Sequence, residues 1–304
     1  MSIDFGGMIR RSFELAWRYK TLWVFGLFAG ASGGDFNFDS SKFVNFNEAD
    51  YRDILECAGL DCLPFSFDEQ FIGTLILWVV AMIILFIVCH LIATPALIDG
   101  VNKITRGGRY EFGTSFSRGI DFMARYFGLS LIGFAVLMAV IAVVVVLAIV
   151  LTPISLLLTI PAMLVAFFFL VHILGLAEVA LVARDVSVGD ALAEGNSLVM
   201  RNIGACFIMT LVLIGLYIGF AIVLGIAALM LYWPINMIVE TITQSLTATI
   251  VLGLFLGLPI ALVLGGYSGT FFSSLYVQFY FQLVEPGPIP ALGQPAPPTA
   301  DSAT

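Results

Sequence analysis

Charged residues are scarce in this chain. Of its 304 residues only 11% are charged, whereas 60% are hydrophobic and the mean hydropathy is +1.05. Soluble domains carry roughly 25% charged residues, so the composition excludes an ordinary soluble protein and predicts an integral membrane protein. The net charge is −8 and no basic face is present, which excludes nucleic-acid binding.

Residues and motifs that carry chemistry are equally few. The chain has two histidines and four cysteines, and it contains no Walker, Rossmann or zinc-protease motif. Residues 30–34 match the pattern GxSxG, but the strand–turn–helix setting that this nucleophile motif requires is missing. We therefore expect a protein that is not an enzyme, with no catalytic residues, no metal site and no cofactor.

Most of the negative charge lies in one segment, residues 34–69. It contains nine acidic residues and only two basic ones, Lys42 and Arg52, which gives this segment a net charge of −7. The acidic residues are Asp35, Asp39, Glu48, Asp50, Asp53, Glu56, Asp61, Asp68 and Glu69. They lack the regular spacing of a calcium-binding loop, so we expect a solvated extracytoplasmic loop rather than a cation site.

Two cysteines, Cys57 and Cys62, lie in this acidic loop with the spacing CAGLDC. Because we place the loop in an oxidising exterior, we expect them to form a short disulfide. A metal pair would need a second set of ligands, which the loop does not offer.

Five apolar runs are long enough to cross about 30 Å of hydrocarbon at 1.5 Å per residue. They cover residues 71–98, 127–151, 155–183, 205–232 and 247–283. A sixth run, residues 21–33, is short. If it also crosses, eleven of the thirteen Lys and Arg residues fall on one side, as the positive-inside rule requires. We therefore predict six spans with both termini in the cytoplasm and a location in the cell inner (plasma) membrane.

A repeated pattern of glycine and arginine precedes the hydrophobic runs. The four residues Gly113, Gly119, Arg125 and Gly128 recur 76 positions later as Gly189, Gly195, Arg201 and Gly204. A weaker copy is Gly6, Ser12 and Arg18. We therefore predict an all-α, polytopic transmembrane helix bundle with three repeats, at about 1–98, 112–183 and 188–284, followed by a disordered Pro-rich tail, 285–304.

Each repeat begins with an amphipathic stretch that we interpret as an interfacial "elbow" helix. In the middle copy its apolar face is Phe112, Phe116, Ile120 and Met123. Three parallel repeats predict a pseudo-threefold arrangement around the membrane normal. This arrangement serves either to build a stable bundle, which we favour, or to line a solute pathway on the axis.

A resemblance to a known family rests on the segment SFELAWRYKTLWVFGLFAG, the repeated elbow pattern and the six-span plan. The chain resembles a group of uncharacterised prokaryotic membrane proteins that includes the membrane domain found beside glycerophosphodiester phosphodiesterases. The resemblance covers most of residues 1–284 and implies a six-helix membrane domain. The soluble phosphodiesterase barrel is absent, so the resemblance implies no hydrolytic activity.

Three ionisable residues fall within or close to the predicted spans: His90, His172 and Glu178. Such residues mark functional sites or internal pairs in membrane proteins. The two histidines can relay protons or bind a metal, but we favour hydrogen-bonded packing. For Glu178 we favour a structural pair with a basic group such as Arg184.

Two further sets of residues are candidates for contacts. The arginines Arg18, Arg125 and Arg201 occupy the same position in each repeat and either bind lipid headgroups or simply anchor the elbows. A stripe of small residues in the last run predicts close helix packing. It consists of Gly253, Gly257, Ala261, Gly265 and Gly269.

Taken together, these patterns predict a membrane scaffold or a lipid-interacting subunit of a complex. Its expected partners are membrane lipids and other membrane subunits. The alternative is a transporter or channel for a small solute or lipid that uses the threefold axis.

Overall fold

The computed structural model describes residues 3–30, 69–150, 154–242 and 246–285. Every regular element in these ranges is a helix, which confirms the predicted all-α class. The helices are α1 (Phe5–Arg18), α2 (Leu22–Gly30), α4 (Glu69–Thr105), α5 (Phe112–Val150), α6 (Ile154–Arg184), α7 (Val188–Arg201), α8 (Ile203–Ile242) and α9 (Leu246–Val284). The predicted disulfide of Cys57 and Cys62, nearly all of the acidic loop and the Pro-rich tail lie outside the described residues.

Five of these helices are long and apolar enough to cross a membrane, which confirms the prediction of a multi-pass membrane protein. The segments are Ile76–Thr105, Phe112–Leu147, Ile160–Arg184, Ile203–Met230 and Phe255–Val284. Each overlaps one of the five long apolar runs. The described part of the sixth candidate is α2, whose nine residues extend about 14 Å at 1.5 Å per residue.

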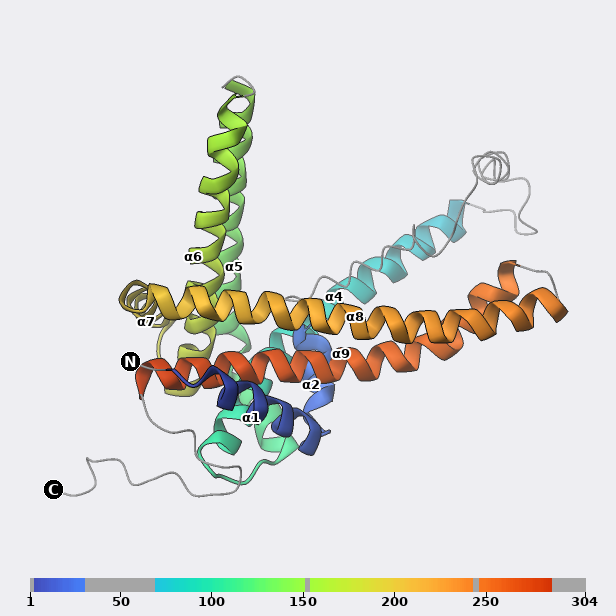
Figure 1. Ribbon diagram of the computed structural model, residues 1–304, viewed down its shortest axis with the longest axis horizontal. Helices are drawn as coiled ribbons and strands as arrows, with labels where there is room; N and C mark the ends of the chain where they lie inside the picture. Colours follow the sequence, from blue (N-terminus) through green and yellow to red (C-terminus); the bar gives the residue numbers. More distant parts are fainter. Residues whose placement is uncertain (1–2, 31–68, 151–153, 243–245, 286–304) are drawn as a thin grey trace.

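The long helices meet at one end of the molecule and diverge from there, as Figure 1 shows. We call the common end the base. It contains α1, α2, α7, the C-terminal ends of α4, α6 and α9, and the N-terminal end of α5. The hairpin of α5 and α6, the pair of α8 and α9, and α4 extend from the base as three arms.

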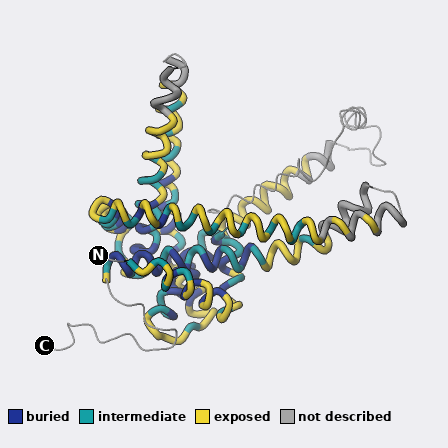
Figure 2. The backbone as a smooth tube through the Cα atoms, viewed as in Figure 1, coloured by how far each residue is buried: buried dark blue, intermediate teal, exposed yellow. Residues whose placement is uncertain are grey.

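Burial is concentrated in the base, whereas the arms expose apolar side chains along most of their length (Figure 2). The fully buried core residues include Leu97 of α4, Leu176 of α6 and Leu275 of α9. These three helices contact one another pairwise. The apolar arms have the surface expected of helices that face lipid, where exposed hydrophobic side chains carry no solvation cost.

Two of the three predicted elbow segments form separate short helices, α1 and α7. Both are capped at the N-terminus: the Asp4 carboxylate accepts a hydrogen bond from the backbone N–H of Gly7 (2.9 Å), and the Ser187 hydroxyl accepts one from Asp190 (3.2 Å). At the C-terminus of α7 the chain breaks at Asn202, whose side chain donates to the carbonyl of Leu198. These hydrogen bonds satisfy backbone groups at the helix ends, which allows α1 and α7 to exist as short, separate helices.

The middle elbow differs from the prediction of a separate helix. Residues 112–125 are the first turns of α5, which continues without a break to Val150. At the corresponding break after α1, the indole N–H of Trp23 donates to the free carbonyl of Ala16 (2.7 Å). Asn202, whose side-chain amide satisfies the end of α7, corresponds to Tyr126 in the middle segment. Tyr126 has no amide that could satisfy a helix end, and α5 continues past it.

The three elbows pack on long helices through equivalent positions. Ser12 of α1 accepts a hydrogen bond from Gln278 of α9 (2.9 Å). A Cβ atom at Gly119 would clash with the Ile92 carbonyl of α4, and one at Gly195 would lie 2.6 Å from the Ile173 carbonyl of α6. Gly119 and Gly195 therefore permit the close approach of two helices, and Ser12 makes a hydrogen bond between helices instead.

The closest helix crossing joins α2 to α9. A Cβ atom at Gly269 would overlap the Gly26 carbonyl, and one at Gly30 would lie 2.8 Å from the Gly269 Cα. The Thr270 hydroxyl lies 3.1 Å from the Leu22 carbonyl and 2.8 Å from the Gly266 carbonyl. Within the predicted small-residue stripe, Gly265 and Gly269 are buried at this crossing. Ala261 is exposed, and Gly257 has open space around it.

Candidate functional site

A chain of polar side chains crosses the interior of the base, and Glu178 of α6 lies near its middle. The hydroxyl of Tyr126 on α5 donates to the Glu178 carboxylate at 3.4 Å. The same hydroxyl has hydrogen bonds with Thr94 of α4 and Ser130 of α5. Tyr126 is almost fully buried, so its hydroxyl depends on these side chains for hydrogen bonds.

A second tyrosine, Tyr276 of α9, interacts electrostatically with Glu178 and leads to His172. The Tyr276 hydroxyl lies 3.4 Å from Nδ1 of His172, and Nε2 of this histidine lies 2.7 Å from the Thr210 hydroxyl. Thr210 donates to the carbonyl of Cys206 (3.1 Å) and therefore accepts from His172. This arrangement assigns the proton of neutral His172 to Nε2 and leaves Nδ1 as an acceptor for Tyr276.

His90 of α4 lies at the other end of this series of polar side chains, near Thr94. Its Nδ1 is 2.7 Å from the carbonyl of Phe28 in α2 and 3.5 Å from the Thr94 hydroxyl. A carbonyl only accepts hydrogen bonds, so Nδ1 of His90 carries the proton. The two histidines thus adopt opposite tautomers. No group of three metal-ligating His, Cys, Asp or Glu side chains occurs among the described residues.

The expected partner of Glu178 is engaged elsewhere. Arg184 lies 3.1 Å from Glu194 of α7, and the Tyr280 hydroxyl donates to the same carboxylate at 2.6 Å. Among the described residues, the hydrogen-bond partner of Glu178 is a tyrosine rather than a cation. The interpretation of Glu178 and Arg184 as a structural pair is therefore wrong, because Arg184 forms its ion pair with Glu194 of α7.

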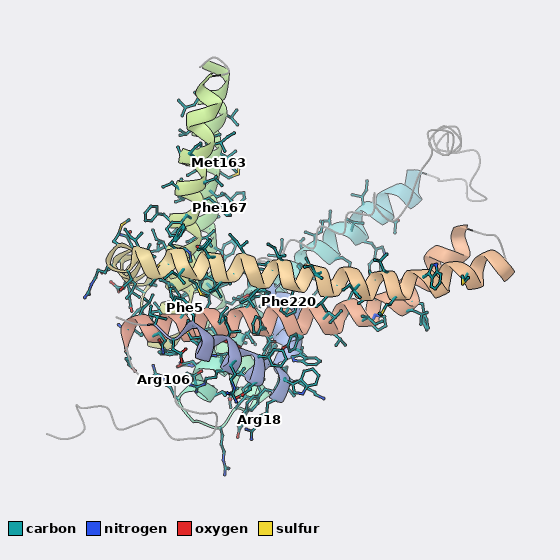
Figure 3. The ribbon with its side chains drawn as sticks, viewed as in Figure 1. Phe5, Arg18, Arg106, Met163, Phe167 and Phe220 are labelled. Carbon is teal, nitrogen blue, oxygen red and sulfur yellow. The ribbon has the colours of Figure 1, made fainter. Side chains whose placement is uncertain are left out.

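The three elbow arginines have different surroundings. Arg125 lies 2.6 Å from Asp185, which Arg118 also approaches at 3.6 Å, and it stacks over the Phe122 ring. Arg18 is exposed at the edge of the base (Figure 3), and Arg201 is exposed at the end of α7. The ion pair partly neutralises Arg125, whereas neither Arg18 nor Arg201 forms an ion pair with another residue that the structure describes.

One buried cation was not singled out from the sequence. Arg11 of α1 is only 6% exposed, and its guanidinium donates to the carbonyl of Thr105 at the end of α4 (3.2 Å). Burial lowers the pKa of Arg11 below its usual value, and Glu14 opposes this effect. The only sequence signal was its place beside Ser12, on the face of α1 that packs on the base.

No protein-family model, no curated protein and no solved structure matches the chain.

Proposed function

We propose that the chain is a non-enzymatic multi-pass membrane protein that holds phospholipids at its base through the elbow helices. The observation that carries this proposal is the two-sided character of α1. One face packs Met8, Ser12 and Leu15 into the base, while Phe13 and Trp17 are 54% and 61% exposed on the other. The exposed aromatic residues lie on the same short helix as the exposed Arg18.

An aromatic group supports the position of this face at the membrane surface. The rings of Phe13, Trp17 and Trp23 each contact Tyr267 of α9 at centroid distances of 5.8–6.3 Å. Tryptophan and tyrosine are enriched at the membrane–water interface, where their rings lie at the level of the headgroups. A lipid phosphate near Arg18 is then within the reach of a charge-assisted hydrogen bond.

The proposal includes six spans and three repeats arranged as a closed ring. In this arrangement each elbow packs on the last helix of the preceding repeat: α5 on α4, α7 on α6, and α1 back on α9. The pairwise contacts of α4, α6 and α9 support an axis lined by these three helices. α2, continued beyond Gly30, would supply the sixth span. The family resemblance is compatible with this plan and remains a prediction.

The lipid proposal predicts unequal effects of the three elbow arginines. A free cation near an anionic membrane surface contributes about 1 kcal/mol, or about a fivefold change in affinity. We expect Arg18→Gln and Arg201→Gln each to weaken binding of phosphatidylglycerol about fivefold. Arg125→Gln should have a smaller effect because Asp185 already pairs with Arg125. Native mass spectrometry of the purified protein with added lipid measures these affinities.

The control variant is Arg109→Gln, which removes an exposed arginine between α4 and α5, outside the elbow positions. We expect a change of less than about twofold, and no effect of any variant on binding of phosphatidylcholine. Equal losses for Arg109→Gln and Arg18→Gln would show general charge attraction and contradict specific elbow contacts.

The proposed orientation places the base in the cytoplasm of a cell with this protein in its inner membrane. It predicts that cysteines replacing Lys42 and Arg118 are labelled by a membrane-impermeant thiol reagent from opposite faces. The comparison of intact cells with inverted vesicles, in a background without the native cysteines, measures this. Labelling of both positions from the same face would contradict six spans.

A transporter or channel remains the second candidate function. The polar chain around Glu178 favours it, because buried ionisable groups in a membrane often lie on the path of a solute or proton.

A further inference from the structure

We infer that Glu178, together with Tyr126 and Tyr276, forms a proton-binding site inside the base, and that hydrogen bonds connect this site to both histidines. This site is separate from the lipid contacts at the elbows. The two proposals can therefore fail independently.

The first support is the number of helices that contribute a side chain to the polar series around Glu178. Seven side chains from α4, α5, α6, α8 and α9 follow one another in space. In order they are Thr210, His172, Tyr276, Glu178, Tyr126, Thr94 and His90. Every member can both donate and accept a hydrogen bond in at least one protonation state. Hydrogen bonds join each pair of neighbours except Tyr276 and Glu178, which interact electrostatically, so a proton passes between these two only when a side-chain rotation or a water molecule connects them.

The second support is the absence of a cation beside Glu178 in the described part of the chain. Glu178 is half-buried, and a carboxylate without a paired cation is costly in a medium of low dielectric constant, whereas a bound proton removes that charge. The titratable groups that face it from neighbouring helices are Tyr126 and Tyr276. Further along are His90 on α4 and, beside Tyr276, Cys206 and Tyr217 on α8. None of these is a permanent positive charge.

The third support is the depth of Glu178 along α6. Arg184 marks the charged surface of the base, six residues after Glu178, and His172 lies six residues before it. Six residues correspond to about 9 Å of helix. Glu178 therefore lies between the aqueous end of the base and the histidine that extends into the membrane.

The proton balance is simple. A hydronium ion at the base gives its proton to the Glu178 carboxylate, which leaves water and a neutral carboxyl group. Tyr276 can then pass its hydroxyl proton to Nδ1 of His172 and take the carboxyl proton in exchange. The products are a cationic imidazole, an unchanged tyrosine and the restored carboxylate.

Infrared difference spectroscopy of the full-length protein in lipid tests the site. We expect a C=O stretching band of a protonated carboxyl group that disappears as the pH rises. Glu178→Gln should remove this band, whereas Asp185→Asn, which changes an exposed ion-paired carboxylate, should leave it in place. A wild-type spectrum without a titrating band, or a band that persists in Glu178→Gln, would overturn the proposal.

The connection to His172 needs a second measurement that does not depend on Glu178 variants. After transfer to D₂O, the carboxyl band shifts at the rate of proton exchange. Tyr276→Phe should slow this exchange about tenfold or more, the scale on which positioned proton donors act. Tyr280→Phe is the matched control, one turn away on α9, because its hydroxyl donates to Glu194 instead. Equal exchange rates in the two variants would overturn the connection.

Discussion

Replacing Gly269 by leucine is expected to give a protein that does not fold stably. Gly269 and Gly26 bring the backbones of α9 and α2 into direct contact, and the added Cβ would overlap the Gly26 carbonyl oxygen and lie 2.7 Å from its carbonyl carbon. A backbone atom cannot rotate away as a side chain can. Overpacking a core costs 1–3 kcal/mol even where side chains can adjust, so we expect a loss of about 3 kcal/mol or more.

Thermal unfolding in detergent, followed by size-exclusion chromatography, measures this loss. The matched control is Gly257→Leu, on the same helix and in the same stripe of small residues, where a Cβ meets no atom within 4 Å. We expect Gly257→Leu to change the free energy of unfolding by less than about 0.5 kcal/mol, as surface substitutions do. Similar losses in both variants would show that the stripe acts through another surface and not through the crossing with α2.

This contrast shows what the sequence alone could predict about helix packing. The repeated spacing of small residues in the last span indicates a helix that can approach another closely. It could not show which part of the stripe is used, because the spacing alone does not reveal the partner helix. In the structure, Gly26 and Gly30 of α2 approach α9 at Gly269, where Gly265 and Gly269 are buried, while Gly257 remains open.

The spans and the candidate site differed in how far they could be predicted. Five spans follow directly from the length of uninterrupted apolar runs, since a membrane helix needs about twenty such residues. The ionisable members of the polar chain, His90, His172 and Glu178, stood out because they are rare in spans. Tyr126 and Tyr276 did not, because a tyrosine in an apolar run is also typical of a membrane interface. Their role depends on contacts between different helices.

The elbow glycines give the second large prediction, in which one chemical change has opposite effects at neighbouring positions. A Cβ at Gly119 would overlap the Ile92 carbonyl and lie 2.9 Å from the Ala96 Cβ. At Gly195 a Cβ would lie 2.6 Å from the Ile173 carbonyl and 3.1 Å from the Ala177 amide nitrogen. We expect Gly119→Ala and Gly195→Ala each to destabilise the protein by about 2 kcal/mol, because α4 and α6 must move apart from their elbows.

At the outer glycines of the repeat the same substitution meets no obstacle. Gly113 and Gly204 have no atom within 4 Å of an added Cβ. Alanine has the higher helix propensity, so Gly113→Ala and Gly204→Ala should leave stability unchanged or raise it by up to about 1 kcal/mol. Thermal unfolding in detergent of all four variants compares the signs. If the inner and outer glycines respond alike, the close contacts of the elbows with α4 and α6 are not what holds the base together, and the closed ring of repeats loses its main support.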